Sequence, residues 1–222
     1  MKRRLFFRLG AVLLLLPSLS ACAARTAVRH FTPASPEQVR DALAAWTSAA
    51  ARAEALPPSR LLYDARMSSG AATLPGTLAV VDDGREVLHA TLTGPFGTRV
   101  AEYTAGAVTG EDSRALVVDP RALRAVLAGT WPEAPSGVDG CEGGECRLVW
   151  DGPISVEAVV DVGAARVRSM SIEGASGRLS IDYDGPLKPW PEQIALRDER
   201  SSRRLSLRLA AIEPLGSVPA DP

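Results

Sequence analysis

Few residues of this 222-residue chain carry side chains that could do chemistry, and the cysteines are the most informative of them. Cys141 and Cys146 stand five positions apart, separated by Glu142-Gly143-Gly144-Glu145. The two glycines allow a tight turn that brings the two Cα atoms within bridging distance. A metal site would need further ligands, and a redox site would have the C-x-x-C spacing. We therefore predict a structural disulfide on a loop, provided that the chain reaches an oxidising compartment.

Catalytic motifs are not evident in the sequence, which contains no G-x-S-x-G elbow, no P-loop and no H-E-x-x-H pair. Of the two histidines, His30 lies in a segment without periodicity, and His89 lies in an alternating segment that favours a solvent-facing or partly packed ring. Asp182-Tyr183-Asp184-Gly185 is similar to the start of a calcium loop, but Gln193 stands where the bidentate glutamate should be. We expect no enzyme activity, no cofactor and no metal site.

The third cysteine, Cys22, closes an export signal at the N-terminus. Four basic residues among the first eight form an n-region. The apolar run Leu13-Leu14-Leu15-Leu16 and the small residues before Cys22 complete the pattern. No acidic residue precedes Cys22. The apolar run is well short of the roughly 20 residues that a membrane-spanning helix needs. The pattern therefore predicts export, with residues 1–21 as the signal peptide.

The cleavage region itself, Leu19-Ser20-Ala21-Cys22, resembles the lipobox of bacterial lipoproteins. The resemblance implies cleavage between Ala21 and Cys22 and acylation of the Cys22 thiol with chains such as palmitate. Cys22 would then become the lipidated first residue of the mature chain. The alternative interpretations are a plain secretory signal with a chance cysteine, or a transmembrane anchor.

The composition of the mature chain limits the classes of partner. Removal of residues 1–21 leaves 201 residues with 21 Lys and Arg against 26 Asp and Glu, a net charge of −5. One large all-β domain or two small ones would fit this length. An acidic chain without a basic cluster is a poor candidate for nucleic acid or for electrostatic binding to anionic lipid. Contact with a membrane would then depend on acyl chains and apolar surface.

The predicted organisation is a flexible tether over 22–34, a domain over 35–213 and a disordered tail over 214–222. Ser35 is a good N-cap, a proline occupies the first helical position, and Gln38 completes a capping box. Apolar residues then recur every three or four positions until the helix ends before Pro57-Pro58. The expected apolar stripe comprises Val39, Ala42, Leu43, Trp46, Ala49 and Ala53.

Beyond residue 60 the apolar pattern changes to period two, which predicts a series of strands. A second, short helix should lie between Asp119 and Gly129, and the segment 131–146, rich in Pro, Gly and acidic residues, reads as a long loop. The expected fold class is mainly β, an unclosed antiparallel half-barrel of about 10–11 strands with an N-terminal helix and a short lid helix. The predicted strands cover 61–67, 77–81, 86–92, 98–104, 115–118, 147–150, 154–162, 166–172, 178–184, 193–197 and 205–209.

One turn of this series has an unusual composition. Gly94-Pro95-Phe96-Gly97 puts a large apolar ring where a turn between strands is normally polar. The Phe96 ring could be displayed at the loop tip, or it could fold back and cap the core. The residues alone do not favour either arrangement.

These landmarks together resemble the outer-membrane lipoprotein receptor LolB and the wider LolA/LolB-like lipoprotein-carrier fold. Leu92-Thr93-Gly94-Pro95-Phe96-Gly97-Thr98 is similar to that family's strand ending in a Pro-Leu-Gly turn. Gly129-Thr130-Trp131-Pro132 is similar to its Gly-Trp-x-x-Pro region, and 191–196 followed by 205–209 resembles its last two strands. The resemblance spans about residues 35–213, and the Cys141–Cys146 loop is an addition to it.

The resemblance implies an apolar cavity that holds acyl chains, in a protein anchored in the cell outer membrane and facing the periplasm. Gly94, Pro95, Phe96 and Gly97 would form the loop that helps to insert lipoproteins into that membrane. Phe96 stands at the position of the family's protruding leucine, which favours its display at the tip. The implied partners are acyl chains of lipoproteins or other lipids, and a periplasmic LolA-like carrier.

Two functions of different class follow from these observations. The first is a lipid-anchored protein that binds acyl chains and helps to insert lipoproteins into the outer membrane. The second is an envelope lipoprotein that uses the same fold as a protein-binding scaffold, with a concavity filled by its own side chains. A periplasmic hydrolase would need a nucleophile–base pair that we do not find in the sequence.

Overall fold

The structure is a computed structural model that describes residues 30–70, 72–104, 107–110, 119–175, 177–201 and 203–215. The chain divides into two units, Met1–His30 and Phe31–Pro222, and the sheet and both helices belong to the second. The predicted signal peptide, Ala21, Cys22 and most of the predicted tether lie outside the described residues.

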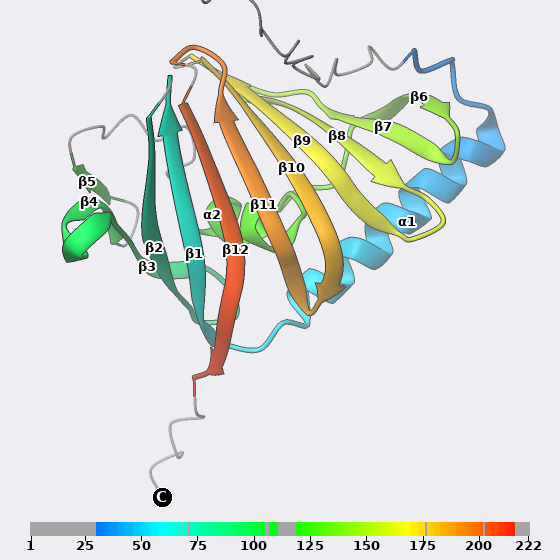
Figure 1. The fold of residues 1–222 in the computed structure, drawn as a ribbon. Helices are drawn as coiled ribbons and strands as arrows, with labels where there is room; N and C mark the ends of the chain where they lie inside the picture. The colour runs from blue at the N-terminus through cyan, green and yellow to red at the C-terminus, as the bar shows by residue number, and fades with distance from the viewer. Residues whose placement is uncertain are drawn as a thin grey trace, which may run out of the picture. The chain divides into compact units, whose positions relative to one another are not determined.

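The described part of the chain forms one antiparallel sheet with two helices, α1 (Pro36–Glu54) and α2 (Pro120–Ala128) (Figure 1). The sheet has twelve strands in the order β5-β4-β3-β2-β1-β12-β11-β10-β9-β8-β7-β6. β5 and β6 are its two edges and do not pair with each other, so the sheet is not closed into a barrel. The predicted fold class is therefore confirmed. The strands are β1 (Ser59–Ser69), β2 (Ala72–Asp82), β3 (Val87–Thr93), β4 (Arg99–Thr104), β5 (Ala107–Gly110), β6 (Gly137–Glu142), β7 (Glu145–Trp150), β8 (Ser155–Asp161), β9 (Arg166–Gly174), β10 (Gly177–Lys188), β11 (Trp190–Asp198) and β12 (Arg203–Pro214).

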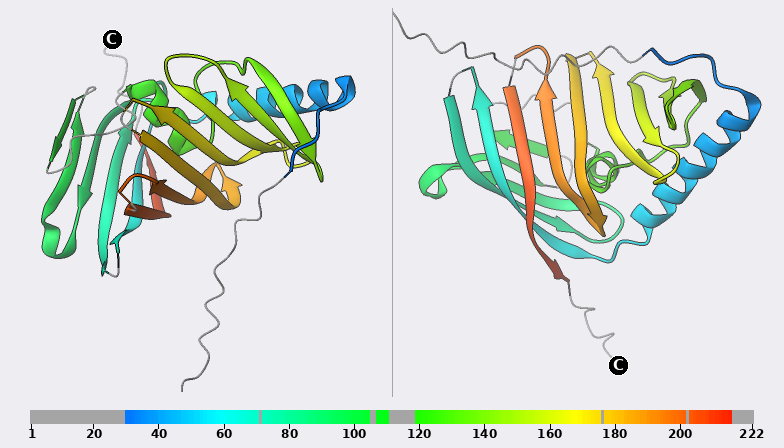
Figure 2. Two further views of the ribbon diagram at one scale, coloured as in Figure 1. Left: turned by 90° about the horizontal axis from the view of Figure 1, so that it is seen from above. Right: turned by 45° about the vertical axis from the view of Figure 1, so that its right-hand side comes forward.

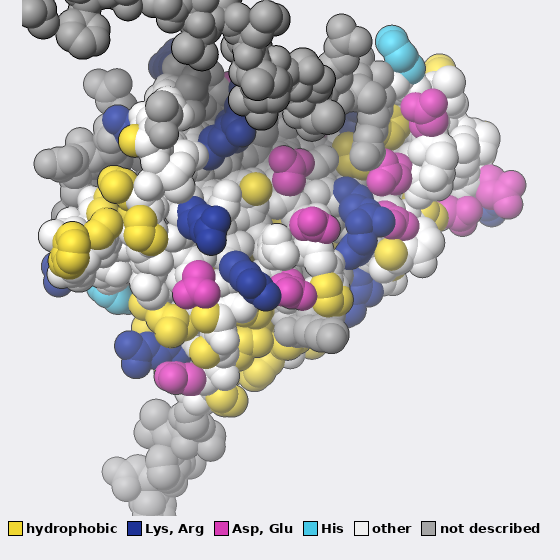
Figure 3. Space-filling model, viewed as in Figure 1, with side chains coloured by type: hydrophobic (Ala, Val, Ile, Leu, Met, Phe, Trp, Pro, Cys, Tyr) yellow, Lys and Arg dark blue, Asp and Glu magenta, His cyan; other side chains and the backbone are white. Residues whose placement is uncertain are grey.

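The two faces of the sheet differ in polarity because successive side chains of a strand point to opposite sides. On β1, Leu61, Tyr63 and Ala65 are buried, whereas the alternating Arg60 and Arg66 are exposed. Both helices lie on the same, inner side of the curved sheet (Figure 2), with α1 against β6–β9 and α2 against β3 and β11. The outer face carries charged side chains of both signs over β1, β11 and β12 (Figure 3).

Helix α1 begins as the sequence predicts, with a complete capping box at Ser35. The Ser35 hydroxyl accepts from the backbone N–H of Gln38, and the Gln38 side chain accepts from the backbone N–H of Ser35. Alanines dominate its buried face and bring the helix axis close to the sheet. Trp46 also packs against the sheet, with its ring centroid 4.9 Å from that of Trp150 on β7 in an edge-to-face arrangement. The predicted stripe needs one correction, because Leu43 is 36% exposed and Ala45 takes its place on the buried face.

The predicted loop over 131–146 was partly wrong, because it contains strand β6. β6 and β7 form a hairpin whose two turn residues, Gly143 and Gly144, both have positive φ (59° and 84°). Cys141 and Cys146 are directly opposite each other in this hairpin, and their sulfurs form a disulfide bond with a Cα–Cα distance of 4.1 Å. Two glycines and two acidic residues hide this strand from a propensity-based prediction, and long-range pairing with β7 creates it.

The folded part of the chain begins earlier than the predicted domain boundary at residue 35. The backbone N–H of Cys141 donates to the carbonyl of Thr32 at 2.9 Å, and the Thr32 hydroxyl donates to the Cys141 carbonyl at 3.0 Å. The Arg147 guanidinium stacks 4.6 Å from the ring centroid of Phe31. Gly140 permits this contact, since a Cβ there would meet the Thr32 carbonyl oxygen at 2.6 Å. Phe31 and Thr32, which the prediction assigned to the tether, therefore contact the β6–β7 hairpin.

Strand boundaries elsewhere follow the predictions within a few residues, and one strand, β5, was not predicted. The strand after β4 is β5 at Ala107–Gly110, and the predicted strand over 115–118 lies outside the described residues. Helix α2 is capped as expected, with the Asp119 carboxylate accepting from the backbone N–H of Arg121 and with Gly129 in a left-handed conformation (φ 76°). The Tyr183 hydroxyl donates to the Val126 carbonyl at 2.8 Å, which ties α2 to β10.

Candidate functional site

The inner face of the sheet contains an open cavity of about 480 Å³ at one end of its central strands. This volume lies in the range of about 300–1,000 Å³ that is typical of small-molecule sites. Seven strands contribute to its wall, and most of the side chains are aliphatic. The apolar lining consists of Met67, Ala72, Leu74, Leu92, Val100, Leu179, Leu196 and Leu205.

Strand register gathers these apolar side chains on one face. Met67 on β1 is directly opposite Leu74 on β2 and Leu205 on β12, and Leu205 is in turn opposite Leu196 on β11. Residues opposite each other in an antiparallel pair point to the same side of the sheet. Leu74 and Val100 remain 52% and 39% exposed. The cavity is therefore an open apolar surface and not a filled core.

A glycine leaves room for this cavity wall. An added Cβ at Gly76 would meet the Thr93 carbonyl oxygen at 2.2 Å and the Met67 methyl at 3.0 Å. Because Gly76 has no Cβ, β3 can approach β2 closely and the Met67 side chain can lie across the face of the sheet. Any larger residue at 76 would displace the strand that carries Leu92.

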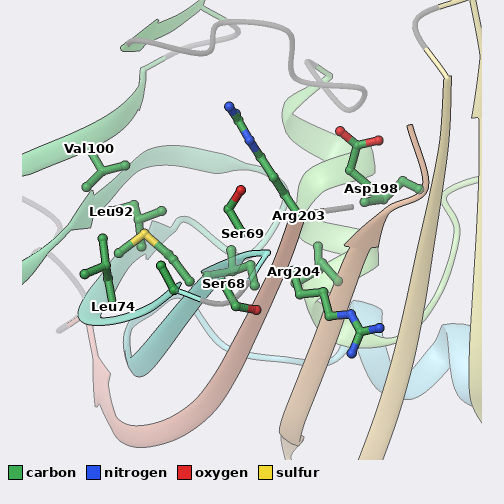
Figure 4. A pocket seen from close by; sticks show the side chains of 13 residues that line it. Ser68, Ser69, Leu74, Leu92, Val100, Asp198, Arg203 and Arg204 are labelled. Atoms are coloured by element: carbon green, nitrogen blue, oxygen red, sulfur yellow. The ribbon is translucent and has the colours of Figure 1, made fainter. Parts of the chain in front are cut away.

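The opposite side of the cavity is polar. The residues on this side are Ser68, Ser69, Asp198, Arg203 and Arg204. Figure 4 shows Asp198 and Arg203 across the cavity from the apolar wall, whereas the Arg204 side chain points away from it, because Arg204 alternates with the inward Leu205. The carboxylate of Asp198 accepts from the Ser201 hydroxyl (2.5 Å) and from the backbone N–H of Arg200 (2.9 Å). These donors hold the pKa of Asp198 below its usual range, with the Ser201 hydroxyl as the largest cause. The cavity thus has one apolar and one charged end.

The loop that the sequence singled out borders the apolar end. It forms a single 3₁₀ turn, η1 (Pro95–Gly97), between β3 and β4, the strands that supply Leu92 and Val100. A Cβ at Gly94 would lie 3.2 Å from the Cγ2 of Val100, so the loop packs directly behind the cavity wall. The backbone N–H of Gly94 donates to the Thr98 carbonyl at 2.7 Å and closes the loop.

Phe96 is displayed at the tip of this loop and does not fold back onto the core. Its side chain is fully exposed, and its backbone has φ 61° and ψ 23°, the left-handed region. This conformation costs a residue with a Cβ about 1–2 kcal/mol. Figure 3 shows hydrophobic side chains gathered at this edge of the molecule, over β4 and η1. An exposed apolar ring on a strained backbone makes the loop a candidate contact surface.

The remaining residues whose side chains could take part in catalysis or metal binding do not assemble into a site. The half-exposed His89 ring contacts the hydroxyls of Thr91 (2.7 Å) and Thr104 (3.1 Å) and lies 3.7 Å from a Glu102 carboxylate oxygen. The acidic segment 182–185 lies within β10, where the side chain of Tyr183 is buried. Among the residues that the structure describes, no group of three or more His, Cys, Asp or Glu side chains could hold a metal ion. Within the same residues, no helix is long and apolar enough to cross a membrane.

Comparisons with known proteins concern the fold. No sequence family and no curated protein matches the chain. Among solved structures, a LolA superfamily protein from Nitrosomonas europaea has a TM-score of 0.49 and 14% identity, over 76% of this chain and 92% of that one. A DUF1329 family protein from Desulfovibrio piger has a TM-score of 0.45 and 9% identity, over 81% and 94% of the two chains. A domain described as an outer membrane lipoprotein-sorting protein, from Vibrio parahaemolyticus, has a TM-score of 0.45 and 8% identity, over 79% and 93%. At these levels of similarity, function has to rest on the residues of this chain.

Sequence reasoning located the loop at Phe96 but missed the lining of the cavity. Alternation identifies the inward residues of a strand, but it does not give the register that brings Met67, Leu74 and Leu205 together. One local signal was available, because Leu179, Leu196 and Leu205 each lie near the end of a predicted strand.

Proposed function

We propose that this chain is a lipid-anchored envelope protein that binds acyl chains in its cavity and helps to insert lipoproteins into the outer membrane. The observation that carries the proposal is the open apolar cavity with the exposed Phe96 loop at its border. Lipidation of Cys22, the periplasmic orientation and a LolA-like donor are parts of the same proposal and rest on the sequence.

Binding in such a cavity would be driven by the burial of hydrocarbon. Each buried CH₂ group of a guest chain contributes about 0.8 kcal/mol. The aliphatic wall offers no directional contacts, so it suits flexible chains of variable length. Transfer from carrier to membrane would then follow differences in affinity, without a covalent step.

Release at a membrane would depend on Phe96. Burial of one phenylalanine ring contributes about 1.5–3 kcal/mol, which gives a weak and reversible contact. An acyl anchor at Cys22 would keep the protein at the membrane, while Phe96 would present the cavity mouth to it. β3 and β4 connect the two functions physically, because they carry both the loop and two cavity residues.

The insertion step can be tested with Phe96→Glu. We expect this variant to lose most incorporation of an acylated lipoprotein into liposomes, because a carboxylate cannot enter the apolar layer. Phe96→Leu should retain activity. Leu62→Glu is the matched control, because Leu62 is a partly exposed leucine of the outer face of β1 and receives the same charge. Incorporation by Phe96→Glu at the rate of the unsubstituted chain would show that insertion does not use this loop.

The binding step can be tested by native mass spectrometry of the full chain carrying Cys22→Ala. We expect acyl lipids to co-purify with it and to be lost in Leu196→Asp, which puts a charge into the cavity wall. An empty protein that also fails to take up added lipid would exclude acyl binding and would favour the scaffold function.

A further inference from the structure

The volume of the cavity limits how much hydrocarbon it can enclose. A methylene group takes up about as much space as a water molecule in the liquid, about 30 Å³. A cavity of about 480 Å³ therefore has room for about 16 methylene groups. This is the size of one long acyl chain, and a second chain of the same length would not fit beside it. A ligand with several acyl chains would leave the others outside.

The charges on the polar side of the cavity are already compensated. Asp198 on β11 is directly opposite Arg203 on β12, and opposite charges in this arrangement stabilise an antiparallel pair. The Asp198 carboxylate also accepts two hydrogen bonds from the turn that follows β11, and Arg203 has an interaction partner as well. The Arg204 side chain points away from the cavity (Figure 4). Among the described residues around the cavity, none therefore offers an uncompensated charge to a head group.

The apolar wall of the cavity gives a ligand no directional contact either, because its side chains are aliphatic. Burial of hydrocarbon stabilises in proportion to the area removed from water and does not depend on the direction of approach. Each methylene group that enters the cavity therefore adds a similar increment, about a fourfold gain in affinity. The gain ends when the cavity is full.

We propose that the cavity encloses a single acyl chain, and that its affinity depends on the length of this chain up to about 16 carbon atoms and not on the head group. This inference rests on the proposed function, because it names the class of ligand for the same cavity. Two residues on opposite sides of the wall limit the length. Ala72 lies on β2 and Leu179 on β10, with three strands between them.

The first test measures affinity against chain length. Even-numbered alkanoates from decanoate to icosanoate displace a fluorescent acyl probe from the full chain carrying Cys22→Ala. We expect affinity to rise by about fourfold for each added methylene group until about hexadecanoate, and then to stay constant. Native mass spectrometry should show one hexadecanoate per protein.

The second test changes the head group and keeps the chain. Hexadecan-1-ol and hexadecyltrimethylammonium should bind within about threefold of hexadecanoate, whereas a charge-assisted hydrogen bond to one head group would separate them by about tenfold or more.

The third test changes the wall. Leu179→Ala enlarges the cavity and should move the plateau to chains about three carbon atoms longer, whereas Ala72→Leu fills it and should shorten the chain at the plateau by about as much. Ala195→Leu is the matched control, because Ala195 is exposed on the outer face of β11 and alternates with the inward Leu196. If Leu179→Ala does not fold, Ala72→Leu, at an exposed position, carries the test alone.

The outcomes separate this inference from the function on which it rests. An affinity that rises through icosanoate without a plateau, two chains bound per protein, or a head-group effect of about tenfold would overturn the inference and leave acyl binding intact. A plateau that no folded wall variant moves would also overturn it, because another part of the protein would then set the length. A failure of every ligand to bind would overturn both the inference and the proposed acyl binding.

Discussion

The Nε atom of Arg124 lies 2.8 Å from a carboxylate oxygen of Asp82, and both side chains are almost completely buried. The same guanidinium donates to the carbonyls of Ala53 (3.1 Å) and Leu56 (3.2 Å), just at the end of α1. One side chain of α2 thus connects that helix to β2 and to the C-terminal end of α1. This clamp holds α2 over the inner face of the sheet.

Arg124→Met should be strongly destabilising, because it leaves the buried Asp82 carboxylate without its positively charged partner and removes a donor from the Ala53 and Leu56 carbonyls. We expect a loss of about 3–5 kcal/mol in the free energy of unfolding, measured by urea denaturation. Arg121→Met, at an exposed site one turn earlier in α2, is the control and should change stability by less than about 0.5 kcal/mol. Equal stability of the two variants would show that the clamp contributes nothing.

The cost of Arg124→Met should also depend on pH. Burial raises the pKa of Asp82, and Arg124 opposes this effect. Without Arg124, the pKa of Asp82 in the folded state should rise further above that in the unfolded state. The contribution of protonated Asp82 to stability is then complete below the pKa of Asp82 in the unfolded state, and it is lost as pH rises through the pKa in the folded state. The deficit relative to the unsubstituted protein should therefore be larger at pH 7 than at pH 4, and a deficit that grows on acidification would contradict this.

Asp161 should give the stability of the protein the opposite dependence on pH, because its pKa is lowered in the folded state. The backbone N–H of Ala164 (2.9 Å) is the largest cause of its lowered pKa, with further contributions from the Arg168 guanidinium. A lowered folded pKa stabilises the protein above the unfolded pKa of about 3.9, and this stability is lost as pH falls through the folded value. Asp161→Asn should be less stable than the unsubstituted protein at pH 7, and the difference should vanish near pH 2. If unfolding curves gave the same stability difference between the two proteins from pH 7 to pH 2, the lowered pKa of Asp161 would not contribute to stability.

Phe96→Gly should separate stability from membrane contact. Glycine relieves the cost of the left-handed backbone at this position but increases the entropy of the unfolded chain. We expect the free energy of unfolding to change by less than about 1 kcal/mol in either direction. Binding to liposomes should nevertheless fall, because the exposed ring is gone. A large destabilisation would mean that Phe96 is a structural residue and not a contact residue.

The disulfide between Cys141 and Cys146 should stabilise the start of the folded chain. Replacement of both cysteines with alanine should cost about 2 kcal/mol, from the entropy of closing a loop of this length. Hydrogen exchange should increase at Thr32 and Cys141, which share a backbone hydrogen bond at the β6 edge. Amides of β1, remote from this hairpin, provide the internal control. Unchanged exchange at Thr32 would show that the pairing with β6 does not need the disulfide.

Local patterns in the sequence were sufficient for both helices and for most of the strands. The capping box at Ser35, the period-two alternation along the strands and the Asp119 and Gly129 caps each depend on residues within a few positions of one another. Such signals can be read directly, since the interactions that they describe are formed within one turn or one strand. The composition of the turn at 94–97 likewise directed attention to Phe96.

The register of the strands and their long-range pairing could not be predicted from those local patterns. The insertion of β12 between β1 and β11 places Leu205 against Met67 and Leu196, and it sets Arg204 opposite Arg197. Each of these contacts joins strands whose relative alignment depends on the whole sheet, and a shift by one residue would reverse every side chain. For the same reason β6 and the Arg124–Asp82 clamp could not be predicted. Both helices and most strands of the protein are encoded locally, whereas strand β6, the cavity and the clamp arise only when the strands pair.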